Sequence, residues 1–201
     1  MVLRMLGRMC VGAGLAVLLV ACGNEDKPQT ALDGVAPQVT PLFVLSPDGV
    51  GPLNADTPFN LIRIGDAFQE LNVAEETHFT NGEKYPVITV KQQVKPLLSI
   101  NPDYQQKNIF SVVVHDNLVG NKLGHPLGSK FMDVYTYGQV EQCAPGMDEW
   151  AGKVMCYAPK TGNILYLFGG TWNGAPTELP PPDVMANWQL EAMVWKAAAR
   201  K

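Results

Sequence analysis

The sequence predicts a mainly β domain: an α+β fold with minor helix, in which a compact antiparallel sheet or sandwich carries two short helices. Three observations support this class. The 19 glycines and 16 prolines among 201 residues indicate many turns and short elements. Short apolar runs rich in β-branched residues recur between those turns. No heptad repeat is visible, which argues against a helical bundle.

The first elements follow from local patterns. A short apolar strand is expected at 42–45. Thr57 and Pro58 predict the start of a helix, with threonine as N-cap and proline at the first helical position. This helix is expected to end near Phe68 and to place Ile62 on its apolar face.

Asn81-Gly82 is the strongest hairpin signal in the chain, because this dipeptide suits a two-residue turn between strands. An Asn101-Pro102 turn is expected to separate two of the strands that follow. Val112, Val113 and Val114 are β-branched, so we expect them to be buried on both faces of a sheet. The strands expected here are 85–90, 97–100 and 109–115.

The second half predicts one more short helix and further strands. Ser129 is expected to cap a helix that runs to Tyr135, and 183–186 favours a single helical turn. The strands expected in this half are 137–143, 153–157, 164–168 and 188–196.

Residues 1–21 are typical of a lipoprotein signal peptide. Arg4 and Arg8 form the positive region, and the apolar run that follows has about ten residues, against about twenty for a spanning helix. The run ends in Leu19-Val20-Ala21-Cys22, a lipobox, so Cys22 is predicted to be lipidated. A plain signal peptide with a chance cysteine and an uncleaved anchor are the alternatives.

The lipidated cysteine is expected to begin a flexible tether, residues 22–41, in front of a single periplasmic domain, residues 42–201. The tether is rich in small and polar residues and spans at most about 60 Å. Gly23 rather than aspartate after Cys22 favours the outer membrane, with the domain facing the periplasm. Signal cleavage removes two basic residues, so the formal net charge changes from −4 to −6.

The remaining cysteines, Cys143 and Cys156, form an even pair in an oxidising compartment, since Cys10 leaves with the signal peptide. They flank a turn, so we predict a disulfide across a hairpin, stabilising the fold by about 3 kcal/mol. A redox pair or metal ligands would be the alternative. Redox pairs usually have two residues between the cysteines, and metal sites need more ligands.

No catalytic, cofactor-binding or metal-binding residues are predicted. The chain lacks the nucleophile elbow, the zinc-protease motif, the P-loop and the dinucleotide fingerprint. A pI near 5.3 argues against nucleic acid as a partner. A hydrolase using His115, Asp116 and His125 is the least favoured reading, because a strand-end polar pair and an exposed loop histidine explain these residues.

The remaining polar and aromatic residues of note do not require a functional site. His78 and the adjacent Glu75 and Glu76 are expected to be solvated. The tryptophans could line a ligand groove or a partner surface, but core packing is favoured because strand aromatics are usually buried. The tryptophans concerned are Trp172, Trp188 and Trp195.

Several short motifs occur in a characteristic order over residues 49–196. They are Gly49-Val50-Gly51-x-Leu53-x-Ala55-x-Thr57-Pro58, Gly120-x-Lys122-Leu123-Gly124, the Cys143…Cys156 pair, Phe168-x-Gly170-x-Trp172-x-Gly174, Pro182-Asp183-x-x-x-Asn187-Trp188 and Val194-Trp195-Lys196. With the lipobox, they make the chain resemble the RpoE-regulated lipoprotein family. The resemblance implies a compact, mainly β envelope domain in a stress regulon, and it supplies no catalytic residues. Residues 75–110 depart most from the family.

The sequence therefore predicts a membrane-anchored envelope lipoprotein, held by Cys22, that is a non-enzymatic binding or structural module for envelope maintenance. An envelope protein or a cell-wall component is the expected partner. The alternative is a small-ligand or lipid-binding periplasmic domain with a groove between sheet and helix.

Overall fold

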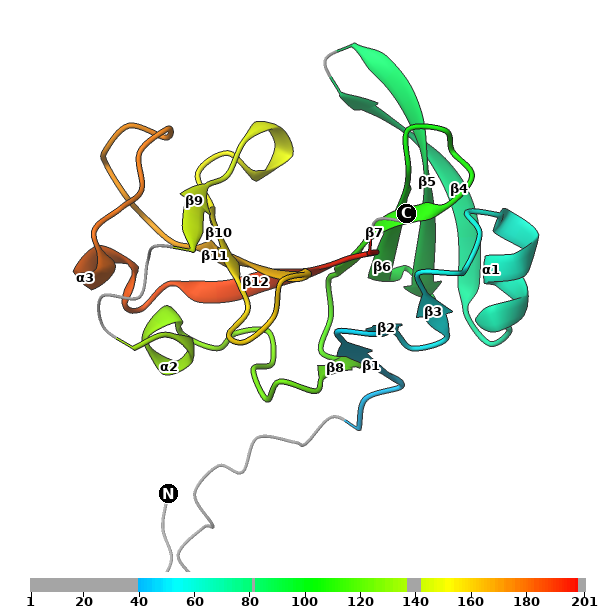
Figure 1. Ribbon diagram of the computed structural model, residues 1–201, viewed down its shortest axis with the longest axis horizontal. Coiled ribbons are helices and arrows are strands. Elements are labelled where there is room, and N and C mark those ends of the chain that lie inside the picture. The colour runs from blue at the N-terminus through cyan, green and yellow to red at the C-terminus, as the bar shows by residue number, and fades with distance from the viewer. Residues whose placement is uncertain (1–39, 81, 137–141, 199–201) are drawn as a thin grey trace, which may run out of the picture. The chain divides into compact units, whose positions relative to one another are not determined.

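The computed structural model describes residues 40–80, 82–136 and 142–198, which contain twelve strands and four helical segments (Figure 1). The predicted signal peptide, Cys22 and most of the predicted tether lie outside the described residues. The strands are β1 (Phe43–Ser46), β2 (Gly49–Val50), β3 (Leu53–Asn54), β4 (Asn72–Thr80), β5 (Glu83–Gln92), β6 (Lys95–Pro102), β7 (Ile109–Val114), β8 (Val119–Asn121), β9 (Cys143–Pro145), β10 (Val154–Tyr157), β11 (Ile164–Gly169) and β12 (Gln189–Lys196). The helices are α1 (Leu61–Ala67), α2 (Phe131–Val134), the 3-10 helix η1 (Asp148–Trp150) and α3 (Pro182–Met185).

The strands form two sheets, so the predicted mainly β class is confirmed. The large sheet is antiparallel and has the order β4-β5-β6-β7-β12-β11-β10-β9. The small sheet has the order β3-β2-β1-β8, and its β1–β8 pair is parallel, unlike the expected antiparallel arrangement. Because β7 pairs with β12, the last strand joins the two halves of the large sheet at its centre.

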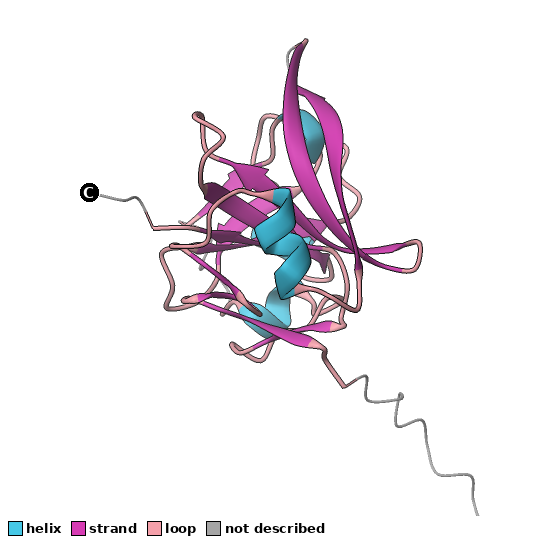
Figure 2. Ribbon diagram, turned by 90° about the vertical axis from the view of Figure 1, so that its right-hand side faces the viewer, coloured by secondary structure: helices cyan, strands magenta, loops and turns pink. Residues whose placement is uncertain are grey.

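The core lies between the two sheets and includes side chains from α1, α2 and α3. One row of paired residues crosses the inner face of the large sheet and is fully buried. The row consists of Val90, Leu98, Val114, Met193, Tyr166 and Cys156. Figure 2 shows α1 between the small sheet and the rising β4–β5 hairpin, and Phe68 at its end packs edge-on against Phe43 of β1, with ring centroids 5.0 Å apart.

The opposite face of the large sheet, here called the outer face, carries the residues that alternate with that row. Its central row consists of Ala74, Thr89, Ser99, Val113, Val194, Leu165 and Tyr157. Val113, Val194 and Leu167 form a small apolar cluster on this face, with Trp150 packed against it. Val112, Val113 and Val114 are all buried, which confirms the expectation of burial on both faces.

The first helix begins three residues later than predicted, at Leu61 instead of Pro58. Its N-cap is Asn60, whose side-chain oxygen accepts a hydrogen bond of 3.0 Å from the Arg63 backbone. The predicted start at Thr57-Pro58 is wrong because Pro58 forms a β-bridge with Asn108, which keeps this segment extended.

The predicted apolar face of this helix is also wrong at one position. Ile62 is 73% exposed, and Ile64 is fully buried instead. Ile64 and Phe68 both pack in the core, because residues four apart lie on the same face of a helix.

The second half holds two short helices where one helix and one turn were expected. Ser129 does not cap α2, because its hydroxyl donates to the Pro126 carbonyl, and Lys130 is the N-cap without a side-chain bond. The single helical turn predicted at 183–186 is confirmed as α3, which has four residues and begins one residue earlier.

The predicted hairpin is confirmed by the pairing of Thr80 with Glu83, although Asn81 lies outside the described residues. The predicted turn at Asn101-Pro102 is wrong, since β6 continues through Pro102. The chain turns just after it, where the Gln106 backbone donates to the Asp103 carbonyl.

Candidate functional site

The loop between β9 and β10 is tied down at its base by the predicted disulfide, which is confirmed. Cys143 and Cys156 are directly paired across the two strands, and the bond closes a segment with a separation of 13 residues. Lys153 near the end of this loop forms an ion pair with Glu191 of β12. These contacts hold the loop, with Trp150 at its centre, over the outer face of the large sheet.

A groove lies beside this loop on the outer face, with a volume of about 430 Å³. One wall is the start of β5, including Glu83 and Tyr85, and the other is η1 with Glu149 and Trp150. Figure 1 shows that the β4–β5 hairpin and the loop between β9 and β10 rise on the same side of the sheet. The groove is thus bounded by segments that lie far apart in the sequence.

Aromatic side chains are the main apolar surface of the groove. Tyr85, Tyr104, Phe110 and Trp150 line it. Tyr104 is fully exposed and Phe110 is 51% exposed, so these rings are accessible to a ligand. Exposed aromatic rings beside polar groups are typical of binding sites.

Polar groups form the floor and one end of the groove. The Asn101 side-chain amide donates a hydrogen bond of 3.2 Å to the Ser111 hydroxyl, between β6 and β7. At the end of β6, a hydrogen bond of 2.8 Å from the Asn108 amide lowers the pKa of the Asp103 carboxyl. The groove therefore combines amide, hydroxyl and carboxylate groups with aromatic rings.

A larger hollow of about 520 Å³ adjoins the groove at the end of β12, but its lining is less informative. It shares Asp103 and Phe110 with the groove, and much of the rest is the small side chains and backbone of Gly162, Ala197 and Ala198. The groove offers more side-chain chemistry, so it is the better candidate site.

The tryptophans singled out in the sequence are mainly packing residues, as expected. Trp195 and Trp188 are 1% and 5% exposed. Trp172 is partly buried against the core, and with Trp188 it borders a hollow of about 290 Å³. An added Cβ at Gly170 would lie 2.2 Å from the Trp188 ring, so the glycine there permits close packing.

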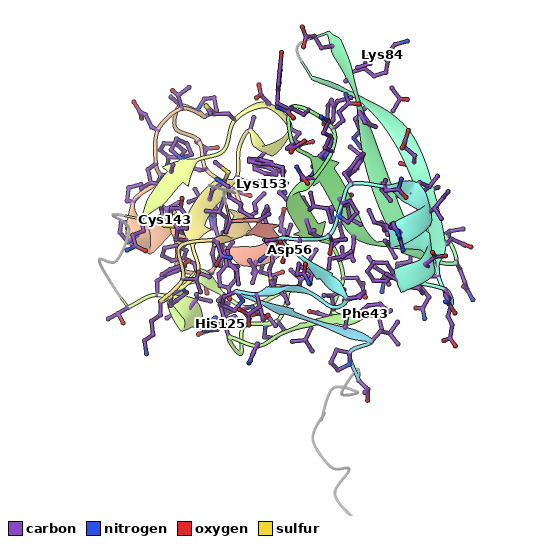
Figure 3. All side chains as sticks on the ribbon, turned by 45° about the vertical axis from the view of Figure 1, so that its right-hand side comes forward. Phe43, Asp56, Lys84, His125, Cys143 and Lys153 are labelled. Atoms are coloured by element: carbon purple, nitrogen blue, oxygen red, sulfur yellow. A yellow bond between two sulfur atoms is a disulfide. The ribbon has the colours of Figure 1, made fainter. Side chains whose placement is uncertain are left out.

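The structure does not bring His115 and His125 together. The His125 ring lies on the inner side, where Nδ1 is 3.2 Å from the hydroxyl of buried Tyr166. The His115 ring lies on the outer face, with Nε2 2.9 Å from the Ser99 hydroxyl. Figure 3 shows His125 on the side of the small sheet and Lys153 of the β9–β10 loop on the other side. The large sheet thus separates the two histidines.

The environments of these histidines differ from the expectation in two respects. His125 is half-buried instead of exposed. His115 was explained as part of a strand-end polar pair with Asp116, but its ring bonds to the Ser99 hydroxyl instead. Asp116 does not complete a triad, because its carboxylate pairs with Lys95 at 2.5 Å and accepts from the Leu118 backbone. Desolvation lowers the pKa of both His115 and His125, which favours their neutral forms.

Glu75 and Glu76 point to opposite faces of β4, because successive residues in a strand alternate. Glu76 lies on the outer face, where Lys91 at 2.6 Å lowers its pKa. His78 is 3.8 Å from the same carboxylate. Glu76 and Lys91 thus form an ion pair on the surface of the hairpin, with His78 beside it.

Two further observations concern the described part of the chain. No group of three or more His, Cys, Asp or Glu side chains there could hold a metal ion. No helix among these residues has the length and apolar character needed to cross a membrane.

Sequence reasoning missed the aromatic residues of the groove. Tyr104 follows β6 in a polar loop, and Phe110 lies in a strand, where burial is the usual expectation. The one local signal is Trp150 directly after Asp148-Glu149, since a tryptophan beside two acidic residues inside a turn is unusual for a core position. The groove itself depends on strand order, which these local patterns do not specify.

Residues 40–197 match the family described as "Protein of unknown function (DUF1131)". A relative from Escherichia coli (strain K12), "Uncharacterized protein YfeY", is 29% identical over 155 residues, which cover 76% of this chain and 78% of the relative. The crystal structure of the uncharacterized protein yfeY from Escherichia coli matches with a TM-score of 0.64 and 26% identity, covering 76% of this chain and 98% of that chain.

Proposed function

The chain belongs to the DUF1131 family of unknown function, and on this premise we propose that it is a lipid-anchored, non-enzymatic binding module of the bacterial envelope. The lipobox ending at Cys22 supports the anchor, and Gly23 supports an outer-membrane location facing the periplasm. The resemblance to RpoE-regulated lipoproteins supports a role in envelope maintenance under stress. The partner bound is an envelope protein or a cell-wall component.

The observation that carries the binding role is the groove on the outer face. Two of its rings, those of Tyr104 and Phe110, are exposed, although burying an aromatic side chain stabilises a fold by about 2 kcal/mol or more. One wall is held by a disulfide and an ion pair, so the groove is preorganised. A rigid groove with aromatic rings that face solvent is better suited to binding a partner than to catalysis.

Photo-crosslinking in intact cells tests this role. A photoreactive amino acid at Tyr104, in the groove, should form a specific adduct. The matched control is the same amino acid at Ile62, which is also exposed but lies on α1. Adducts common to both positions, or none at Tyr104, would contradict a binding role for the groove. An adduct with a lipid or small molecule would favour the alternative of a ligand-binding domain.

A serine hydrolase is the second candidate function, because Ser99 and His115 lie within hydrogen-bond distance. Against it, neither Ser99 nor His115 lines the groove. The Asp116 carboxylate, which would orient a catalytic histidine, is paired with Lys95.

We therefore expect no labelling of Ser99 by a fluorophosphonate, which reacts with activated serine hydroxyls. The purified protein should remain unlabelled while a serine hydrolase in the same tube is labelled. Labelling of the unaltered protein that disappears in Ser99→Ala would establish the hydrolase instead.

A further inference from the structure

The walls of the groove carry two carboxylates that form no ion pair with the other described residues. Glu83 and Glu149 are exposed and lie on opposite walls. The ion pairs found in the described part of the chain use other carboxylates, those of Glu76, Asp116 and Glu191. Asp103, at the end of the groove, is already bonded within its own loop. The groove therefore presents negative charge from both sides.

The aromatic rings beside these carboxylates suit a cation as well. The face of an aromatic ring attracts an ammonium or guanidinium group placed within about 6 Å of its centroid. The protein already uses this interaction at the rim, where the Lys196 ammonium lies 5.6 Å from the Phe110 centroid. Lys84, the basic residue that lines the groove, lies 5.8 Å from the Phe79 ring. Neither lysine forms an ion pair with Glu83 or Glu149 among the described residues.

From this charge complementarity we propose that the groove binds an extended peptide segment that carries lysine or arginine side chains. The cationic groups lie between the carboxylates of Glu83 and Glu149 and stack on Tyr104. The Asn101 amide and the Ser111 hydroxyl on the floor bond to the peptide backbone. Phosphorylated glycans and anionic lipid headgroups are disfavoured, because the same carboxylates repel them. This proposal rests on the proposed binding function and specifies its partner as a basic peptide segment.

Calorimetric titration of the lipidated protein in a neutral detergent, at physiological salt, tests the proposal. The probe is a capped peptide of alternating lysine and glycine, with the matching glutamate peptide and a tetramer of N-acetylglucosamine as comparisons. The lysine peptide should bind saturably and the two comparisons should not.

Three variants locate the binding. Glu83→Gln/Glu149→Gln should weaken lysine-peptide binding about tenfold, and Tyr104→Ala should weaken it several-fold without affecting folding, because the ring is fully exposed. The matched control is Asp66→Asn/Glu70→Gln, which changes the net charge equally at exposed positions of a separate hollow beside α1. This control should leave the affinity unchanged.

Three results would overturn the proposal. Equal weakening by the two double variants would mean attraction by net charge alone. Binding of the sugar tetramer but not of the peptide, lost in Tyr104→Ala, would identify a glycan site instead and leave the proposed binding function intact. Absence of any binding, together with no adduct at Tyr104 in cells, would reject the binding function as well.

Discussion

Replacing Cys22 by serine should release the protein from membranes and abolish its labelling with radioactive palmitate. Only a thiol at this position can take the diacylglycerol, so the serine variant has no anchor. Each buried CH₂ of an acyl chain contributes about 0.8 kcal/mol to membrane affinity. The loss of several chains therefore moves the protein almost completely from the membrane fraction to the soluble or precursor fraction.

Cys10→Ser is the matched control, because Cys10 lies in the predicted signal peptide and leaves with it. This variant should be labelled and anchored like the unaltered protein. Cell fractionation and palmitate labelling measure both variants side by side. Unchanged labelling of Cys22→Ser would reject lipidation at this residue and with it the proposed anchor.

Removing the Cys143–Cys156 disulfide should lower the free energy of unfolding by about 3 kcal/mol. The crosslink restricts the unfolded chain over a separation of 13 residues, and losing this restriction favours unfolding. Most domains have a stability of only 5–15 kcal/mol, so the expected change is large. Alanine is the suitable replacement, because Cys156 is fully buried and a serine hydroxyl there would need a hydrogen-bond partner.

Chemical denaturation of the alanine variants measures this effect. Cys143→Ala and the double variant Cys143→Ala/Cys156→Ala should lose similar stability, since either change removes the crosslink. A reducing agent should destabilise the unaltered protein and leave the double variant unaffected. The same denaturation midpoint for the double variant and the unaltered protein would show that the disulfide does not stabilise the fold.

The disulfide also links stability to the proposed site. It closes the loop that carries Glu149 and Trp150, one wall of the groove. The double variant should therefore form less of the adduct at Tyr104 than the unaltered protein, even at temperatures where it is fully folded.

Much of the fold could be predicted because its signals are local. The strands at 85–90, 109–115 and 164–168 were recognisable as short runs of apolar residues that are β-branched or aromatic. They correspond to β5, β7 and β11, and only residue 115 lies outside its strand. The Asn-Gly hairpin and the cysteine pair were likewise recognisable within a few residues. At the start of α1 the prediction was wrong because a distant segment decided the outcome: the bridge from Asn108 to Pro58 delays the helix.

The candidate site could not be predicted for a related reason. Glu83 and Tyr104 follow β4 and β6, whereas Glu149 and Trp150 come from a loop more than forty residues later. They line one groove because β12 inserts beside β7 and joins the two halves of the sheet. Strand order arises from contacts between distant segments, and no local pattern records it.

The sequence by itself determined the β class, the hairpin and the cysteine pairing, and it carries the lipobox on which the proposed anchor rests. Each depends on residue chemistry within a short span, such as a turn that needs Asn-Gly or two thiols that flank one turn. The tertiary structure alone decided which residues share a face. It separated His115 from His125 by placing them on opposite sides of the large sheet, and it brought Glu83 and Glu149 to the two walls of one groove. The physical reason is that side chains alternate across a strand, so register and strand order set which distant groups meet.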